Sequence, residues 1–126
     1  MIVLDTSALV FWTLDREHLS ARALSAIESD PEKLVSAISI WEIGLKVKKG
    51  GLELPLPISD YAARLETVEG LRIEAVGVQT WLKNLELEWS HRDPADRTVV
   101  ATAMLHDSPL VTSDATIRSF YDRSVW

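Results

Sequence analysis

Short runs of apolar residues alternate along this chain with longer stretches in which apolar residues recur every three or four positions. The first run, Ile2 to Leu4, stops abruptly at an acid, Asp5. Unbroken apolar runs of this length are typical of strands buried on both faces, and the longer period is typical of helices. Strands that alternate with helices predict parallel pairing. The chain is therefore expected to be an α/β protein, with helices on both faces of a parallel sheet.

The expected elements cover most of the sequence. We expect strands at residues 2–4, 33–37, 71–76, 110–112 and 124–126. We expect helices at residues 7–14, 19–27, 39–49, 58–68, 79–87 and 94–106, with a short helix after Asp114. The clearest boundaries are Gly50-Gly51, which ends a helix, and Asp93-Pro94, which begins one. No repeat or linker divides the sequence, so residues 1–126 are expected to form one domain.

Composition disfavours one class of protein and excludes others. The net charge is −6, from 19 acids against 13 bases, whereas a non-specific nucleic-acid coat protein is normally basic. Cysteine is absent, which excludes disulfides, zinc thiolate sites and a cysteine nucleophile. The first residues lack the basic start of a signal peptide, and no apolar run approaches the ~18–20 residues that span a bilayer. We therefore expect a soluble, cytoplasmic protein with no membrane partner.

Four acids lie at strand ends or helix starts. Asp5 ends the first strand, Glu42 and Asp96 lie in the first turns of expected helices, and Asp114 follows the fourth strand. In parallel sheets, ligands bind beyond the carboxyl ends of the strands. Carboxylates gathered there repel one another unless a cation lies among them, and Mg²⁺ or Mn²⁺ prefers oxygen ligands. Together, the acids predict a metal site for phosphoryl chemistry.

Each acid also has a purely structural explanation. Asp5, Asp93 and Asp114 each suit the residue that caps the start of a helix, because a side-chain oxygen can accept a hydrogen bond from the first turn. Ser39 and Glu42 fit the S-x-x-E capping box. Taken one at a time, the acids favour capping, since caps are common and metal ligands are rare.

The segments around these acids resemble the PIN-domain proteins, and among them the VapC-type toxin ribonucleases of bacterial toxin–antitoxin pairs. The resemblance rests on Asp5-Thr6-Ser7, Trp41-Glu42-Ile43, His91-Arg92-Asp93-Pro94-Ala95-Asp96-Arg97 and Leu110-Val111-Thr112-Ser113-Asp114, in this order. It implies a three-layer α/β/α sandwich with a central parallel sheet. It also implies an endoribonuclease that depends on Mg²⁺ or Mn²⁺ and leaves 5′-phosphate and 3′-hydroxyl ends.

The resemblance also implies roles for individual residues. The catalytic and metal-binding carboxylates would be Asp5, Glu42, Asp96 and Asp114, with Asp5 and Asp96 as the main ligands. Asp93 competes with Asp96 and is the better helix cap, so whether it joins or replaces Asp96 is open. Hydroxyls that orient the carboxylates or waters would be those of Thr6, Thr112 and Ser113, although ordinary turn chemistry explains them as well.

Basic and aromatic residues near these acids are candidates for contacts with partners. Lys46 and Lys49 share a helical face with Glu42 and are candidate contacts for the RNA backbone, the alternative being an ion pair with Glu42. Arg97 is a third candidate, with a salt bridge as the alternative. The family resemblance implies a VapB-type antitoxin and a homodimer. Trp12 and Trp41 are our candidates for the antitoxin side.

Three other functions compete with the toxin. A receiver-type phosphoacceptor domain is also short, acidic and α/β, but Asp5-Thr6 is not a pair of adjacent acids and the last strand lacks a lysine. A housekeeping RNA-processing PIN nuclease would share the acids, and a PIN-like scaffold used only for protein contacts would not need them.

His91 is considered as an acid–base group of a metal-free ribonuclease, but no second histidine lies near it in the sequence.

Overall fold

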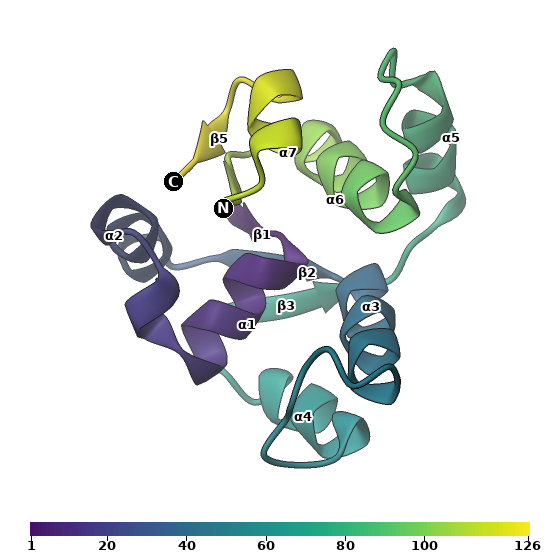
Figure 1. Ribbon diagram of the computed structural model, residues 1–126. Coiled ribbons are helices and arrows are strands. Elements are labelled where there is room, and N and C mark those ends of the chain that lie inside the picture. Colours follow the sequence, from purple (N-terminus) through teal and green to yellow (C-terminus); the bar gives the residue numbers. More distant parts are fainter.

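Five short strands form one parallel sheet at the centre of the computed structural model, which describes residues 1–126 (Figure 1). The strands are β1 (Ile2–Leu4), β2 (Lys33–Ser36), β3 (Leu71–Glu74), β4 (Leu110–Val111) and β5 (Ser124–Val125). Their order in the sheet is β3-β2-β1-β4-β5, and every neighbouring pair is parallel. The first strand of the sequence is therefore the central strand of the sheet.

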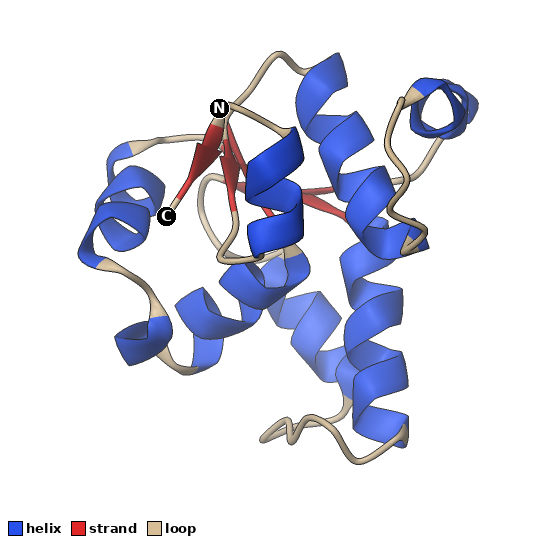
Figure 2. Cartoon of the chain, turned by 45° about the horizontal axis from the view of Figure 1, so that its top comes forward, coloured by secondary structure: helices blue, strands red, loops and turns tan.

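Seven α-helices surround the sheet (Figure 2). They are α1 (Thr6–Leu14), α2 (Ala21–Ser29), α3 (Ala37–Lys48), α4 (Ile58–Leu65), α5 (Val78–Glu86), α6 (Pro94–Leu105) and α7 (Ala115–Phe120), and a 3₁₀ turn covers Arg16–His18. Every helix and strand expected from the sequence is present, with ends that differ by no more than three residues. None of the seven helices combines the length and the apolar character of a membrane span.

Successive residues of the strands point to opposite faces, and each face has its own core. Val3, Leu34 and Leu110 pack with α6 and α7, whereas their neighbours in the strands pack with α1, α2 and α4. These strand residues are fully buried, as expected for a parallel sheet covered on both sides. Helix α5 packs mainly against α6, so it lies outside the layer that α6 and α7 form on their face of the sheet. The predicted three-layer α/β/α sandwich is confirmed.

The parallel topology brings the ends of several strands to one edge. Asp5 alone separates β1 from α1, β2 runs directly into α3, and three residues connect β4 to α7. The backbone N–H of Asp5 donates to the carbonyl oxygen of Val111 (3.1 Å), which ties the end of β1 to the end of β4. The start of α6 reaches the same region because α6 packs against both β1 and α3. This edge collects most of the acids singled out in the sequence.

The turn before β3 depends on glycine. Gly70 has φ +79°, and a Cβ at this position would collide with the carbonyl oxygen of Pro31. The Gly70 carbonyl in turn accepts the N–H of Lys33 (2.7 Å) at the start of β2. Only a residue without a side chain fits both the backbone angle and the space.

Candidate metal centre

Asp5 is buried at the carboxyl end of the central strand, with 6% of its surface exposed. It caps α1, because its Oδ1 accepts the N–H of Ala8 (2.7 Å). Burial raises the pKa of Asp5 to about 6; hydrogen bonds from Thr112 and Ala8 act in the opposite direction, and the charges of Asp96 and Asp114 raise it further. The capping explanation is thus correct for Asp5, but a cap alone does not require a carboxylate buried near other acids.

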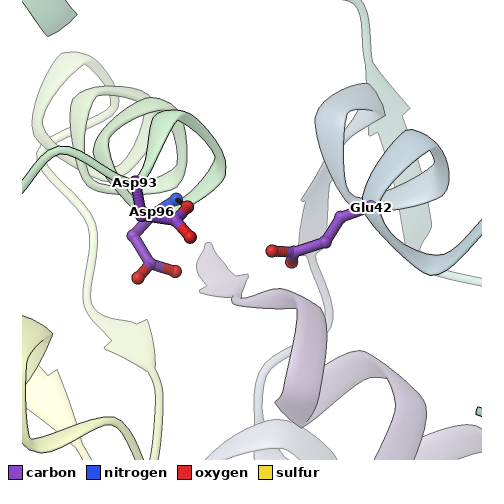
Figure 3. Close-up of side chains that lie close together, drawn as sticks. All are labelled: Glu42, Asp93 and Asp96. Atoms are coloured by element: carbon purple, nitrogen blue, oxygen red, sulfur yellow. Dashed lines mark hydrogen bonds between the residues drawn. The ribbon is translucent and has the colours of Figure 1, made fainter. Parts of the chain in front are cut away.

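Three further carboxylates meet beside the end of β1. Glu42 from α3 and the pair Asp93 and Asp96 from the start of α6 have carboxylate oxygens within 4.8 Å of one another. Figure 3 shows the side chains extending toward each other across the space between the two helices. Asp93 also caps α6, since its Oδ1 accepts the N–H of Asp96 (2.9 Å). The cap is thus confirmed for Asp93, and the geometry joins Asp93 to Asp96 in one cluster.

Charge repulsion links this cluster to the other two predicted acids. The pKa of Asp96 is raised by burial first and lowered by a hydrogen bond with His91; the charges of Asp93, Asp114 and Glu42 raise it again. Asp114 is exposed and caps α7, with its Oδ1 accepting the N–H groups of Thr116 (2.8 Å) and Ile117 (3.1 Å). Asp5 and Asp114 lie outside the 4.8 Å group. The charge of Asp114 nevertheless raises the pKa of Asp96, and the charge of Asp96 raises that of Asp5.

The capping box expected at the start of α3 is wrong. The helix begins at Ala37, and the side chain of Ser36 caps it by accepting the N–H of Ile38 (3.3 Å). Ser39 is fully buried inside the helix, where its hydroxyl accepts a hydrogen bond from Thr6 (2.9 Å). The earlier start moves Glu42 from the first turn to the second, so its carboxylate has no capping role.

The three predicted hydroxyls have different surroundings. Thr112 is fully buried, its Oγ1 accepts the N–H of Asp114 (3.1 Å), and its side chain also hydrogen-bonds Asp5. Thr6 is committed to Ser39, which joins the starts of α1 and α3. Ser113 is half-buried between Thr112 and Asp114. Of the three, Thr112 is the one that contacts two of the acids directly.

The predicted lysines lie beside the cluster. Lys46 and Lys49 are exposed and line a recess of about 220 Å³ with Glu42, Asp93 and Trp41. The ion pair between Glu42 and Lys46 considered as the alternative is absent, since the one ion pair that a lysine side chain makes in the chain is Lys83–Glu86 (3.7 Å). The recess thus has carboxylates and free ammonium groups on its walls.

Arg97 has a structural role, and its contact with RNA stays a prediction. Its guanidinium donates to the carbonyl oxygens of Asn84 (2.6 Å), Leu87 (3.3 Å), Trp89 (2.7 Å) and His91 (3.1 Å), and to the amide oxygen of Asn84 (3.2 Å). These bonds hold the segment between α5 and α6 against α6. The salt bridge that the sequence offered as the alternative is absent, since none of the ion pairs of the chain includes Arg97.

His91 is the residue of this site that the sequence analysis undervalued. Its Nε2 lies 2.7 Å from Oδ2 of Asp96. The partner of His91 is an acid five residues later in the sequence, so the lack of a second histidine nearby did not bear on this contact. The short distance in the sequence to the start of α6 was the available signal.

The donor set fits a hard divalent cation. The cluster offers carboxylate oxygens, which Mg²⁺ and Mn²⁺ prefer over nitrogen or sulfur. The raised pKa values of Asp5 and Asp96 show that burial and neighbouring negative charge make ionisation costly, and a cation among the acids removes that cost. The residues present are therefore suited to a divalent metal.

Comparisons with known proteins agree with this geometry. A family model for the PIN domain matches residues 2–122. Ribonuclease VapC22 of Mycobacterium tuberculosis is 31% identical over 119 residues, which is 94% of this chain and 90% of that protein.

Solved structures share the fold. A chain of a toxin–antitoxin complex from Klebsiella pneumoniae superposes with a TM-score of 0.70 at 19% identity, covering 100% of this chain and 97% of that one. FitAcB from Neisseria gonorrhoeae gives 0.66 at 21% identity, covering 97% and 94%. VapC20 of Mycobacterium tuberculosis, a toxin that cleaves the sarcin-ricin loop, gives 0.63 at 20% identity, covering 94% of each chain. With its sheet order, its carboxylate cluster and the match over nearly its whole length, the chain belongs to the PIN-domain family.

Proposed function

We propose that this protein is a metal-dependent endoribonuclease and the toxin of a VapBC-type toxin–antitoxin pair. The observation that carries the proposal is the set of acids at the end of β1, of which Asp5 is buried and Glu42, Asp93 and Asp96 lie within 4.8 Å of one another. The similarity to a protein named Ribonuclease VapC22 supports the substrate class and the toxin. Residues 1–126 would act as a single domain in the cytoplasm, where the RNA substrate is found.

The carboxylates would hold Mg²⁺ or Mn²⁺. Asp5 and Asp96 are the proposed main ligands, and Glu42, Asp93 and Asp114 complete the negative pocket around them. When bound, the cation supplies positive charge and activates water for attack on a phosphodiester bond. Thr112 holds both Asp5 and the backbone of Asp114 in place, so it keeps these acids oriented. One carboxylate can accept the proton of the attacking water as general base.

The recess beside the cluster is the proposed path of the RNA backbone. Lys46 and Lys49 line it opposite Asp93, and neither is paired with an acid. A phosphate group between the lysines and the metal would meet positive charge on both sides. In an acidic chain, such a local basic wall is the feature that allows a polyanion to approach the carboxylates.

The proposed activity is tested by incubating the purified protein with a mixture of structured RNAs in Mg²⁺ or Mn²⁺, beside EDTA. Matched variants are Asp5→Asn and Asp96→Asn, with Asp122→Asn as an exposed control far from the cluster. We expect cleavage that needs the metal, stops in the first two variants and continues in the third. Cleavage that survives EDTA and both variants would contradict the assigned site, and folded, metal-binding protein that cleaves no RNA would contradict the activity.

An apolar groove is the proposed docking site of the antitoxin. It has a volume of about 360 Å³ and lies between α1 and α4, where Trp12, Leu56 and Tyr61 line it and Arg16 and Arg64 stand at its rim. This lining suits an apolar segment with acidic neighbours. Trp41, the second candidate from the sequence, is 55% exposed beside the acid cluster, where an antitoxin that covered the site would contact it.

The proposed homodimer interface is the outer face of α5. Val78, Trp81, Leu82 and Leu85 are exposed there, and their spacing places them on one stripe of the helix. An exposed apolar stripe of this kind marks a contact surface. Leu85→Glu should convert a dimer to a monomer in light scattering after size exclusion, whereas Gln79→Glu on the same helix should not. A wild-type protein that is monomeric at all concentrations would refute the dimer.

A toxin differs from a housekeeping nuclease in its effect on the host. Induced expression of the wild-type chain should arrest growth, and expression of Asp96→Asn should not. Cells that grow normally with active, soluble enzyme would favour RNA processing over the toxin.

A further inference from the structure

His91 contacts the carboxylate of Asp96, one of the acids of the cluster. Its Nε2 lies 2.7 Å from Oδ2 of Asp96, and about a quarter of each side chain is exposed. We propose that His91 is a positioning residue, which donates its Nε2–H to one oxygen of Asp96 and so keeps that carboxylate directed toward Glu42 and Asp93. The inference rests on the proposed function, because it assigns His91 to the metal site of that ribonuclease.

The imidazole packs against an aromatic pair. Its ring centroid lies 4.8 Å from the centroid of Trp89, with an angle of 42° between the two ring planes. Trp89 in turn stacks on Phe120 of α7, with centroids 4.5 Å apart and an angle of 7° between the ring planes. Packed aromatic rings have few accessible orientations. The stack therefore restricts the direction in which the imidazole nitrogen can point.

The backbone of His91 is fixed as well. Arg97, one turn into α6, donates to the carbonyl oxygens of His91 (3.1 Å) and Trp89 (2.7 Å). The same helix carries Asp96 in its first turn. Helix α6 thus holds both the donor, His91, through Arg97 and the acceptor, Asp96, in its first turn. The hydrogen bond between these two side chains therefore costs little conformational entropy.

Asp96 needs such a partner because its neighbours are acids. Glu42 and Asp93 bring carboxylate oxygens within 4.8 Å of Asp96, and repulsion between like charges would turn a freely rotating side chain away. A hydrogen-bond donor on one oxygen opposes that rotation and leaves the other oxygen available. Groups that orient metal ligands in this way typically contribute about 10- to 100-fold in metal affinity.

The chain contains a matched control for this contact. His106 ends the same helix and pairs with Glu74 of β3, with its Nε2 2.9 Å from Oε1, and its exposure of 27% is close to the 26% of His91. His106 and Glu74 are not part of the acid cluster. The two histidines thus make the same type of contact, and only one makes it to a proposed metal ligand.

The test compares His91→Phe with His106→Phe in the full chain. Phenylalanine retains an aromatic ring against Trp89 but lacks the hydrogen-bond donor. Binding of Mn²⁺ is measured by calorimetry and by the electron paramagnetic resonance signal of free Mn²⁺, without RNA. We expect His91→Phe to bind Mn²⁺ about 10-fold to 100-fold more weakly than the wild type, His106→Phe to bind as the wild type does, and His91→Gln, which retains a donor, to recover most of the affinity.

The outcomes separate the inference from the proposed function. Wild-type protein that binds no Mn²⁺ would overturn the metal site and the inference with it. If the wild type binds Mn²⁺ and His91→Phe binds it with the same affinity, the inference alone is overturned. An equal loss in His91→Phe and His106→Phe would also overturn it, because the effect would then be general to the fold.

The position of the proton on the His91 ring can be measured in the wild-type protein, so this test does not depend on whether a variant folds. Two-bond ¹H–¹⁵N correlation spectra of the histidine rings should show His91 with a proton on Nε2, both without and with saturating Mg²⁺. An Nε2 without a proton in the Mg²⁺-loaded protein would overturn the positioning role, since that nitrogen could not then donate to Asp96.

Discussion

Replacing Asp5 by asparagine should stabilise the folded protein in the absence of metal, although it should abolish the activity. Asp5 is 6% exposed, and its pKa is raised from 3.8 to about 6, mainly because burial disfavours the charged form. Asparagine has nearly the same shape and can still accept the N–H of Ala8 through its amide oxygen. The variant therefore removes a buried negative charge and preserves the cap of α1.

The size of the effect follows from the two pKa values. Between pH 3.8 and about pH 6 the folded chain holds a proton on Asp5 that the unfolded chain has released, so stability falls as the pH rises through this window and is level above it. Because each pKa unit corresponds to about 1.4 kcal/mol, the ionised Asp5 costs roughly 3 kcal/mol at pH 7.5. At about 4 °C per kcal/mol for a domain of this length, the gain in melting temperature is on the order of 10 °C.

The assay is thermal unfolding in EDTA, followed by circular dichroism at pH 7.5 and pH 5. Asp5→Asn should melt above the wild type at pH 7.5, and the gap in free energy should be about half as large at pH 5, where the folded wild type has mostly taken up the proton. Asp122→Asn, at an exposed position, should melt as the wild type does. A melting temperature of Asp5→Asn equal to or below that of the wild type at pH 7.5 would refute the reasoning that this carboxylate is strained by burial and by its acidic neighbours.

Three further predictions concern the metal, an anchor and a turn. Mn²⁺ at a concentration 100 times its dissociation constant should stabilise the wild type by about 2.7 kcal/mol, and Asp96→Asn should remove this shift in a melting experiment; a wild type unmoved by metal would contradict the site. Arg97→Ala should cost roughly 3 kcal/mol in urea unfolding, because its bonds to four carbonyl oxygens are lost, whereas Arg118→Ala on the exposed side of α7 should cost little. Gly70→Ala should destabilise the protein by about 2 kcal/mol or more. The loss should exceed that of Gly50→Ala, because both glycines have positive φ but only Gly70 faces a backbone oxygen. Equal losses in the two variants would show that the contact with Pro31 is relieved easily.

The elements of this fold were predictable because their signals are local. The apolar run before Asp5 marks β1, and Asp93-Pro94 marks the start of α6 to the residue. Such boundaries depend on burial and on capping chemistry between residues that are close in the sequence. The acids at helix starts were also informative, since Glu42 and Asp96 lie within 4.8 Å of each other, whereas Asp5 and Asp114 lie outside this group.

Contacts between distant segments were not predictable in the same way. Ser39 looked like a helix cap, but a hydroxyl 33 positions away, that of Thr6, holds it inside the core, and only the folded chain brings the two together. For Arg97, which follows Asp96, the sequence left a contact with RNA and a salt bridge open, and it gave no sign of the bonds to backbone carbonyls. The shape of the segment between α5 and α6, whose carbonyl oxygens surround the guanidinium, is a property of the tertiary structure.

The central place of β1 has a consequence for how the protein is made. Val3 and Leu4 pair on one side with residues 34 and 35, but on the other side with Leu110 and Val111, which are synthesised last among their partners. Asp5 is fixed by the same late segment, through Val111 and Thr112. A nascent chain therefore carries Asp5 through the synthesis of residues 6–110 before the strand that sets it in place has been made. Asp5 can take its position beside the acids of α3 and α6 only after β4 has paired with β1.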